Sequence, residues 1–226
     1  GSAIDDTLVI KPVQPKDEGA YICEITNDIC TELTLYSRPK HLIIADGRSL
    51  DSLALVALYN STDGPNWTNS DNWLTGRLET WYGVFLQNDR VNRISLSNNQ
   101  LAGPLPDEIG QLSELTRLYL SDNEITTVPE SIGNLNQLTS LTLGNTSVTE
   151  LPSTISNLSN LITLDLHSNG ITLFPVGISG LTSLSTLHLN DNNITIIPES
   201  IENLTAVQYY LLDHLTCTSK IVIFFK

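Results

Sequence analysis

The residues whose types best suit chemistry are Asp165, His167 and His188, which lie in the segments "LDLHSN" and "LHLN". A carboxylate beside two imidazoles could form a weak metal site or an acid–base pair. The same side chains could instead form an exposed polar patch on a binding surface, which is the simpler interpretation. Asp165 and His188 are far apart in the chain, so their proximity depends on the elements that carry them.

Other signatures of catalysis are missing from the sequence. It contains no Gly-rich phosphate loop, no H-E-x-x-H motif and no G-x-S-x-G motif. The three cysteines match no metal-binding spacing, and Cys23 could pair with Cys30 or with a cysteine outside this sequence, while Cys217 stands apart. We therefore expect no enzymatic activity, no cofactor and no resident metal, with Asp165, His167 and His188 as weak metal candidates.

The charge of the chain restricts its partners. The formal net charge is -14, which argues against nucleic acids and anionic membranes because both require clustered Lys and Arg. Residues 91–206 hold eleven acidic side chains but only two basic ones, Arg93 and Arg117. This excess either serves solubility or favours a basic partner. No apolar run is long enough to cross a bilayer.

A leucine pattern, L-x-x-L-x-L-x-x-N-x-L, repeats along the chain at spacings of 24 and then 23 residues. Roughly seven buried apolar side chains per unit stabilise it by about 1.5–3 kcal/mol each, whereas ordering a unit costs about 1.5 kcal/mol per residue. One unit therefore cannot fold alone, and neighbouring units must share a core. The units begin at Val91, Leu115, Leu138, Leu161, Leu184 and Val207.

Each unit predicts a short strand with inward leucines, a turn and an extended return path. Asparagine at the ninth place can bond the backbone of adjacent units, and proline suits a return path without ladder hydrogen bonds. In the third unit Thr146 replaces this asparagine, and Asn145 is a candidate to compensate. The asparagines are Asn99, Asn123, Asn169 and Asn192; the prolines are Pro106, Pro129, Pro152, Pro175 and Pro198.

This pattern resembles the leucine-rich repeat family and covers residues 91–206 as five repeats. The resemblance implies an α/β solenoid: a right-handed superhelix with a parallel sheet on its concave side. Adjacent strands lie about 4.8 Å apart, so Asp165, His167 and His188 should be neighbours on that face. The candidate ligand-binding residues of the concave face are Arg93, Arg117, Tyr119, Thr142, Asp165, His167, His188 and Tyr209.

Residues 46–90 are predicted to cap the amino-terminal end of the solenoid. Asp51 is a plausible helix N-cap, and Leu53 to Leu58 suit an amphipathic helix. The "W-x-G-V" at residues 81–84 resembles the cap of plant-type extracellular repeats, although Glu79 and Leu86 occupy the places of its cysteines. Packing of Trp67, Trp73 and Trp81 should replace the missing disulfide. Cysteine-free caps with "GPNW" resemble those of secreted proteins from Bacteroidetes.

Residues 4–45 do not follow the leucine pattern and are predicted to form a separate segment. The D-x-G-x-Y-x-C pattern from Asp17 to Cys23 resembles a corner of the immunoglobulin-like fold, and "ELTLYSRPKHLIIA" would form its last strand. Too few residues are present for a sandwich, so we expect a partial, all-β immunoglobulin-like segment. The "GS" start and the absence of methionine indicate that residues 1–3 were left by cleavage of a longer chain.

Residues 207–226 are predicted to hold a terminal strand, in "VQYYLL", and a cap or tail. The apolar "SKIVIFFK" either folds over the last repeat or pairs with another chain. A homodimer through this tail, or through the partial immunoglobulin-like strands, is therefore a possible assembly.

These features predict a non-enzymatic recognition or adhesion module. It would belong to a secreted or surface-displayed bacterial protein and bind a protein or carbohydrate through the concave face, without nucleic acid and without membrane insertion. Two alternatives stay open: the substrate-selecting arm of a larger secreted enzyme, and an ectodomain fragment of a eukaryotic receptor. In the latter, the six N-x-[ST] sequons would carry glycans.

Overall fold

The computed structural model describes residues 50–75 and 77–207 with their side chains, and the backbone of residues 19–21, 24–27, 30–36, 40–42, 47–49 and 209–211. The chain divides into two compact units, Gly1–Asp46 and Gly47–Lys226. The predicted tail after the last strand, the disulfide partners of Cys23 and Cys217, and any pairing through the tail lie outside the described residues.

The first unit contains two separate antiparallel pairs. Strand β1 (Gly19–Tyr21) pairs with β4 (Lys40–Leu42), and β2 (Glu24–Asn27) pairs with β3 (Cys30–Tyr36). The prediction of a single last strand over "ELTLYSRPKHLIIA" is wrong, because β3 and β4 divide that stretch and join different partners. These short pairs give no support to the immunoglobulin-like assignment.

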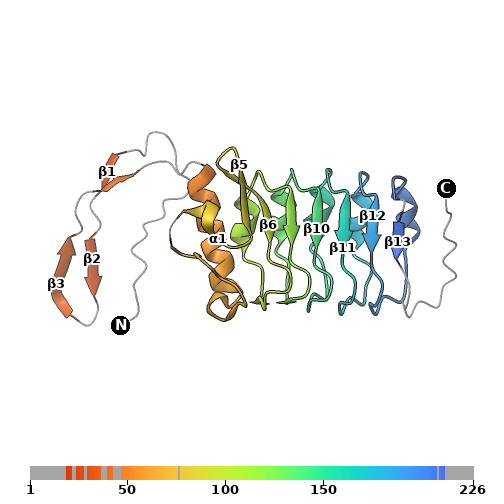
Figure 1. Ribbon diagram of the computed structural model, residues 1–226, viewed down its shortest axis with the longest axis horizontal. Helices are drawn as coiled ribbons and strands as arrows, with labels where there is room; N and C mark the ends of the chain where they lie inside the picture. The colour runs from red at the N-terminus through yellow and green to blue at the C-terminus, as the bar shows by residue number, and fades with distance from the viewer. Residues whose placement is uncertain are drawn as a thin grey trace. The chain divides into compact units, whose positions relative to one another are not determined.

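The second unit begins with the helix α1 (Gly47–Ser61) and two 3-10 helices, η2 (Gly64–Asn66) and η3 (Leu78–Thr80). A seven-stranded sheet follows in the order β13-β12-β11-β10-β8-β6-β5 (Figure 1). Only β5 runs antiparallel to its neighbour; the other pairs are parallel. The strands are β5 (Val84–Gln87), β6 (Arg90–Ser95), β8 (Arg117–Tyr119), β10 (Ser140–Thr142), β11 (Thr163–Asp165), β12 (Thr186–His188) and β13 (Tyr209–Leu211).

The return path of each repeat carries a 3-10 helix rather than an α-helix. A proline in extended conformation precedes each of these helices, and its carbonyl accepts the N–H of an isoleucine three residues later, as in Pro129 and Ile132. The helices are η4 (Asp107–Gln111), η5 (Glu130–Asn134), η6 (Ser153–Asn157), η7 (Val176–Gly180) and η8 (Glu199–Asn203). A further small parallel sheet joins β7 (Ala102–Gly103) to β9 (Glu124–Ile125).

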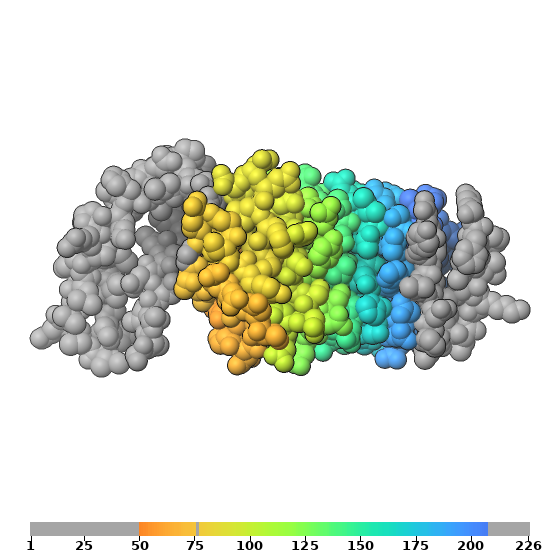
Figure 2. Space-filling model, viewed as in Figure 1, coloured from red at the N-terminus to blue at the C-terminus, as the bar shows by residue number. Residues whose placement is uncertain are grey.

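The repeats share one continuous apolar core. The leucines that open the second to fifth units, Leu115, Leu138, Leu161 and Leu184, are fully buried, and so are the two inward strand leucines of each of those units. Successive repeats lie as adjacent bands along the unit (Figure 2). This confirms the prediction that each unit covers its leucines only by stacking on its neighbours.

The predicted asparagine ladder is also present. The side-chain oxygen of Asn123 accepts the N–H groups of Asn99 and Leu101 at 3.0 Å, and its nitrogen donates to the carbonyls of Leu96 (2.8 Å) and Leu120 (2.9 Å). Each such amide therefore satisfies backbone groups of two repeats at once. Asn169 and Asn192 donate in the same way, and Asn99 bonds Asn69 of the cap.

The compensation expected from Asn145 is not what the structure shows. The amide of Asn145 donates to Asp122 at the surface (2.8 Å). The hydroxyl of Thr146 itself lies 3.0 Å from the carbonyl oxygen of Leu143 and 2.7 Å from the side-chain oxygen of Asn169. Because a hydroxyl carries one proton, it donates to only one of these oxygens at a time.

The prediction of Asp51 as a helix N-cap is wrong. The helix α1 begins four residues earlier, and Asp51 is buried within it, with 1% of its surface exposed. Its carboxylate accepts from Nε and Nη2 of Arg90 (3.0 and 2.9 Å) and from the N–H of Val91 (2.7 Å). Through these hydrogen bonds, Asp51 connects α1 to the start of β6.

The cap tryptophans pack together, as predicted. Trp67, Trp73 and Trp81 are each at most 6% exposed, and neighbouring rings lie 4.8 and 5.0 Å apart between centroids. Each indole N–H donates to a backbone carbonyl within the cap. Tyr59 from α1 joins the cluster against Trp67 and Trp73.

Candidate ligand-binding face of the sheet

The strand register brings the predicted candidates onto one surface. Because side chains alternate along a strand, the residues flanking each buried leucine face outward. The third-place row across the sheet is Phe85, Arg93, Arg117, Ser140, Thr163, Thr186 and Tyr209; the fifth-place row is Ser95, Tyr119, Thr142, Asp165, His188 and Leu211. We call the surface formed by these two rows the sheet face; it corresponds to the predicted concave face.

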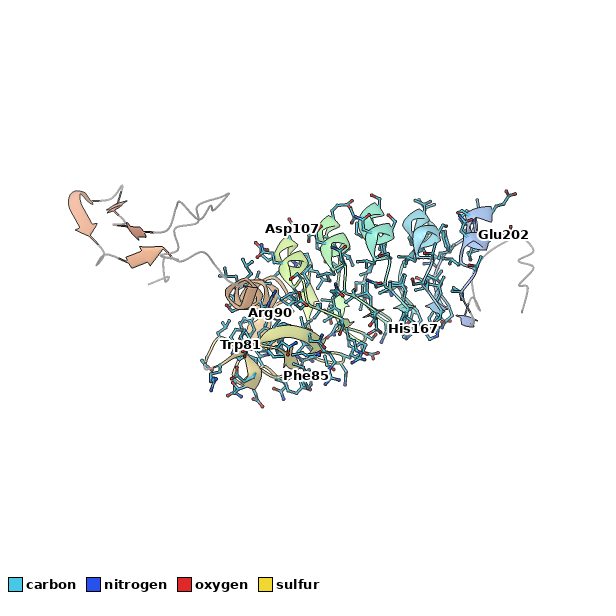
Figure 3. The ribbon with its side chains drawn as sticks, turned by 90° about the horizontal axis from the view of Figure 1, so that it is seen from above. Trp81, Phe85, Arg90, Asp107, His167 and Glu202 are labelled. Carbon is cyan, nitrogen blue, oxygen red and sulfur yellow. The ribbon has the colours of Figure 1, made fainter. Side chains whose placement is uncertain are left out.

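Seven of the eight candidates lie in the two rows of the sheet face. His167 lies two residues beyond Asp165, just after β11, and points to the same side of the sheet as Phe85, while Asp107 and Glu202 lie on the opposite, helical side (Figure 3). Tyr209 aligns with Thr186, but its side chain lies outside the described residues. Whether these residues bind a ligand stays a prediction.

The predicted cluster of Asp165, His167 and His188 is assembled. Nδ1 of His167 lies 2.7 Å from Oδ1 of Asp165, and Nδ1 of His188 lies 3.7 Å from Oδ2. The side chains of His167 and His188 are 34% and 30% exposed, so solvent and a partner can reach them. The ring of His167 lies over Gly144 of the preceding repeat, where a side chain would collide with it.

This arrangement does not support the metal hypothesis. Both imidazoles turn Nδ1 toward the same carboxylate, and Nδ1 of His167 is within hydrogen-bond distance of it, so that nitrogen is already used inside the cluster. Within residues 50–75 and 77–207, no three His, Cys, Asp or Glu side chains come together as a metal site would require. The cluster therefore presents two imidazoles and a shared carboxylate as hydrogen-bonding groups on the sheet face.

Phe85 is a sheet-face residue that the repeat pattern missed. It lies on β5 directly opposite Arg93, and its ring stacks under that guanidinium, with Cζ 3.7 Å from the ring centroid. Phe85 is 43% exposed. A signal was available in "WYGVFLQNDRVNRISL", because "ND" between two alternating segments is typical of a hairpin that would place Phe85 beside Arg93.

Two hollows of the described surface lie outside the two rows of the sheet face. One, of about 290 Å³, is lined by Gln87, Asn88, Arg90, Asn92, Glu114, Thr116 and Gln137, and another, of about 250 Å³, lies on the return path around Pro152. Neither includes a residue of the two rows. The sheet face is thus an open surface, which suits an extended or bulky partner better than a small molecule.

Among the described residues, no helix combines the length and apolarity needed to cross a bilayer.

The repeats match the models of known protein families. Residues 131–223 match the family model of a leucine-rich repeat region, and residues 89–148 match that of a leucine rich repeat. This chain is a leucine-rich repeat protein. Neither matching family is one of enzymes, and the matches support neither the immunoglobulin-like assignment nor the resemblance to Bacteroidetes.

Similar proteins include plant receptors. A segment of 76 residues is 45% identical to a probable leucine-rich repeat receptor-like protein kinase of Arabidopsis thaliana, covering 32% of this chain and 8% of that protein. The crystal structure of PEPR1–AtPEP1 superposes with a TM-score of 0.65 at 28% identity, covering 73% of this chain and 24% of the other.

Another similar structure is the repeat ectodomain of the plant membrane receptor kinase GASSHO1/SCHENGEN3 from Arabidopsis thaliana, in complex with CASPARIAN STRIP INTEGRITY FACTOR 2. Its TM-score is 0.52 at 35% identity, and the match covers 54% of this chain and 15% of that one. The repeat protein described here thus spans only a small part of the length of each of these relatives.

Proposed function

We propose that this leucine-rich repeat protein is a recognition module that binds a protein or peptide partner across its sheet face. The observation that carries the proposal is the row structure of that face. Arg, Tyr, Thr, Asp and His side chains stand on adjacent strands whose backbones are hydrogen-bonded from β6 to β13. Arg and aromatic residues are the ones that protein interfaces favour.

The scaffold suits this role because it is formed before the partner arrives. The strand leucines and the asparagine ladder hold the two rows in place, so binding requires ordering of side chains only. A preorganised surface loses less conformational entropy on association than a flexible one. The complex of the GASSHO1/SCHENGEN3 ectodomain supports a protein or peptide as the ligand class.

We further propose that the protein acts outside the cell, as an ectodomain segment of a receptor or of a surface protein. Its similarity to receptor-like kinases and a receptor ectodomain supports this placement. Of the functions that the sequence left open, the receptor ectodomain is therefore the better supported. Adhesion, a carbohydrate ligand and a bacterial source find no support in these relatives.

Selection from a random dodecapeptide library displayed on phage tests the sheet face. Peptides selected on the wild-type protein would be assayed by fluorescence anisotropy against a triple variant, Thr142→Ala, Asp165→Ala and His188→Ala. A matched control variant carries Asp107→Ala and Glu202→Ala on the helical side. We expect the triple variant to lose binding and the control to retain it; equal binding to all three proteins would exclude the part of the sheet face formed by Thr142, Asp165 and His188.

A further inference from the structure

We propose that the cap-proximal end of the sheet face is a carboxylate-binding site, formed by Phe85, Arg93, Arg117 and Tyr119, for an acidic segment of a protein partner. This inference rests on the proposed function and names the chemistry of its ligand. It also differs from the basic partner that was one of the two interpretations of the net negative charge.

The four residues form one compact group on three neighbouring strands. Phe85 of β5 is paired with Arg93 of β6, and Arg93 is paired in turn with Arg117 of β8. Tyr119 lies two residues from Arg117 on the same face of the same strand. Arg93 and Arg117 are direct cross-strand partners on strands about 4.8 Å apart, so we expect one acidic segment to contact both.

In the described part of the chain, the two arginines of this group lack the carboxylate partners that Arg77 and Arg90 have. Arg90 is paired with Asp51, and Arg77 with Glu79. Within residues 50–75 and 77–207, no carboxylate forms an ion pair with Arg93 or Arg117. They are also the only basic residues between residues 91 and 206, so their adjacency is not a by-product of a basic surface.

Arg93 is held in place, yet one of its donors is unused. Its guanidinium stacks on the ring of Phe85, which restricts its orientation. Its Nε is buried and has no hydrogen-bond partner in the described part of the chain. Because this Nε is buried, a carboxylate of a partner would bond the outer Nη groups of the Arg93 guanidinium instead.

The surroundings of the arginine pair favour a peptide over a free anion. Phe85 exposes an aromatic surface beside the two charges, and Tyr119 adds a half-buried ring and hydroxyl. A partner that combines an acidic side chain with an apolar neighbour would cover both. The rest of the repeat region is acidic and repels an acidic segment. Such a segment therefore docks at the arginine pair and not at other parts of the repeats.

The test repeats the dodecapeptide selection on the wild-type protein and on the variant Arg93→Gln with Arg117→Gln. Arg77→Gln is the control, since it removes one positive charge from an exposed pair that belongs to neither row of the sheet face. We expect peptides selected on the wild type and on the control to be enriched in Asp and Glu over the input library. The enrichment should vanish on the double variant.

A double-mutant cycle then locates the contact. The strongest acidic peptide is compared with its Asn/Gln counterpart by anisotropy, and we expect Arg117→Gln to weaken the acidic peptide roughly tenfold but not its amide counterpart. Circular dichroism melting checks that the variants are folded. An Arg93→Lys variant, which keeps the charge but loses the planar fork, should bind at an intermediate level.

Two results would overturn this inference: no enrichment in Asp and Glu on the wild type, or the same enrichment on the double variant. Its failure is separable from that of the proposed function. A different result is that the selected peptides are non-acidic and still bind the Thr142, Asp165 and His188 triple variant more weakly than the wild type. That result would contradict the carboxylate site but support binding at the sheet face.

Discussion

The eighth residue of every repeat takes a left-handed backbone conformation. The φ angles are positive at Asn98 (54°), Asp122 (59°), Asn145 (53°), Ser168 (51°) and Asp191 (56°). Asn and Asp tolerate this region better than other L residues, because their short polar side chains can bond locally. The polar row at this place is therefore explained by backbone geometry.

Ser168 is the least suitable of these five residues, and this leads to a prediction. Replacing Ser168 by Asn should raise the free energy of unfolding by about 0.5 kcal/mol, because Asn adopts positive φ more readily. Replacing it by Val, which is β-branched, should lower the free energy by more than about 1 kcal/mol. Urea denaturation of the two variants measures both effects; a stabilising Val would contradict the explanation.

At the scale of elements, the attachment of α1 to the sheet depends on Asp51. Its buried carboxylate receives three hydrogen bonds from Arg90 and Val91, whose positions in the chain are about forty residues away. The pair of Arg77 and Glu79 offers a contrast within the same cap, since their side chains are 77% and 38% exposed. Similar ion pairs should thus contribute very differently to stability.

We predict that Asp51→Ala lowers the free energy of unfolding by about 2 kcal/mol, because it removes the acceptor of the Val91 N–H and the carboxylate that pairs with Arg90. Glu79→Ala should change it by less than about 0.5 kcal/mol, since exposed ion pairs contribute little. Thermal and urea unfolding of both variants provide the comparison. If both variants lost the same free energy of unfolding, Asp51 would not be what holds α1 against the sheet.

At the scale of the whole second unit, the repeats should behave as one cooperative body. Each buried leucine contacts a core that extends from the cap into the fifth repeat, so damage in one repeat weakens the covering of its neighbours. Aliphatic residues on the surface of the same repeats lack this role. Ile162, for example, is 46% exposed although its neighbour Leu161 is fully buried.

This contrast gives the prediction at this scale. Leu141→Ala, in the middle of the sheet, should lower the free energy of unfolding by about 3 kcal/mol through lost burial and a cavity. Ile162→Ala should change it by less than about 1 kcal/mol. Equilibrium urea denaturation followed by circular dichroism and by tryptophan fluorescence tests both magnitude and cooperativity: the cap tryptophans should report the loss caused at Leu141.

Much of the fold was predictable because its determinants are local and repeated. Inward leucines, turn asparagines and prolines occupy fixed places, and strand alternation then determines which residues flank each leucine. The neighbourhood of Asp165, His167 and His188 followed from that register alone. The same reasoning failed at Thr146: its own hydroxyl lies beside Leu143 and Asn169, while the amide of Asn145 is bonded to Asp122 at the surface.

The sequence by itself determined the stacked repeats, their parallel sheet and the set of residues on its exposed face, since each follows from a short pattern applied many times. Only the tertiary structure decided that Asp51 is buried against Arg90 rather than capping a helix, and that Phe85 lies under Arg93. The physical reason is that Asp51 and Phe85 lie in the cap, where the periodicity of the repeats assigns no contacts.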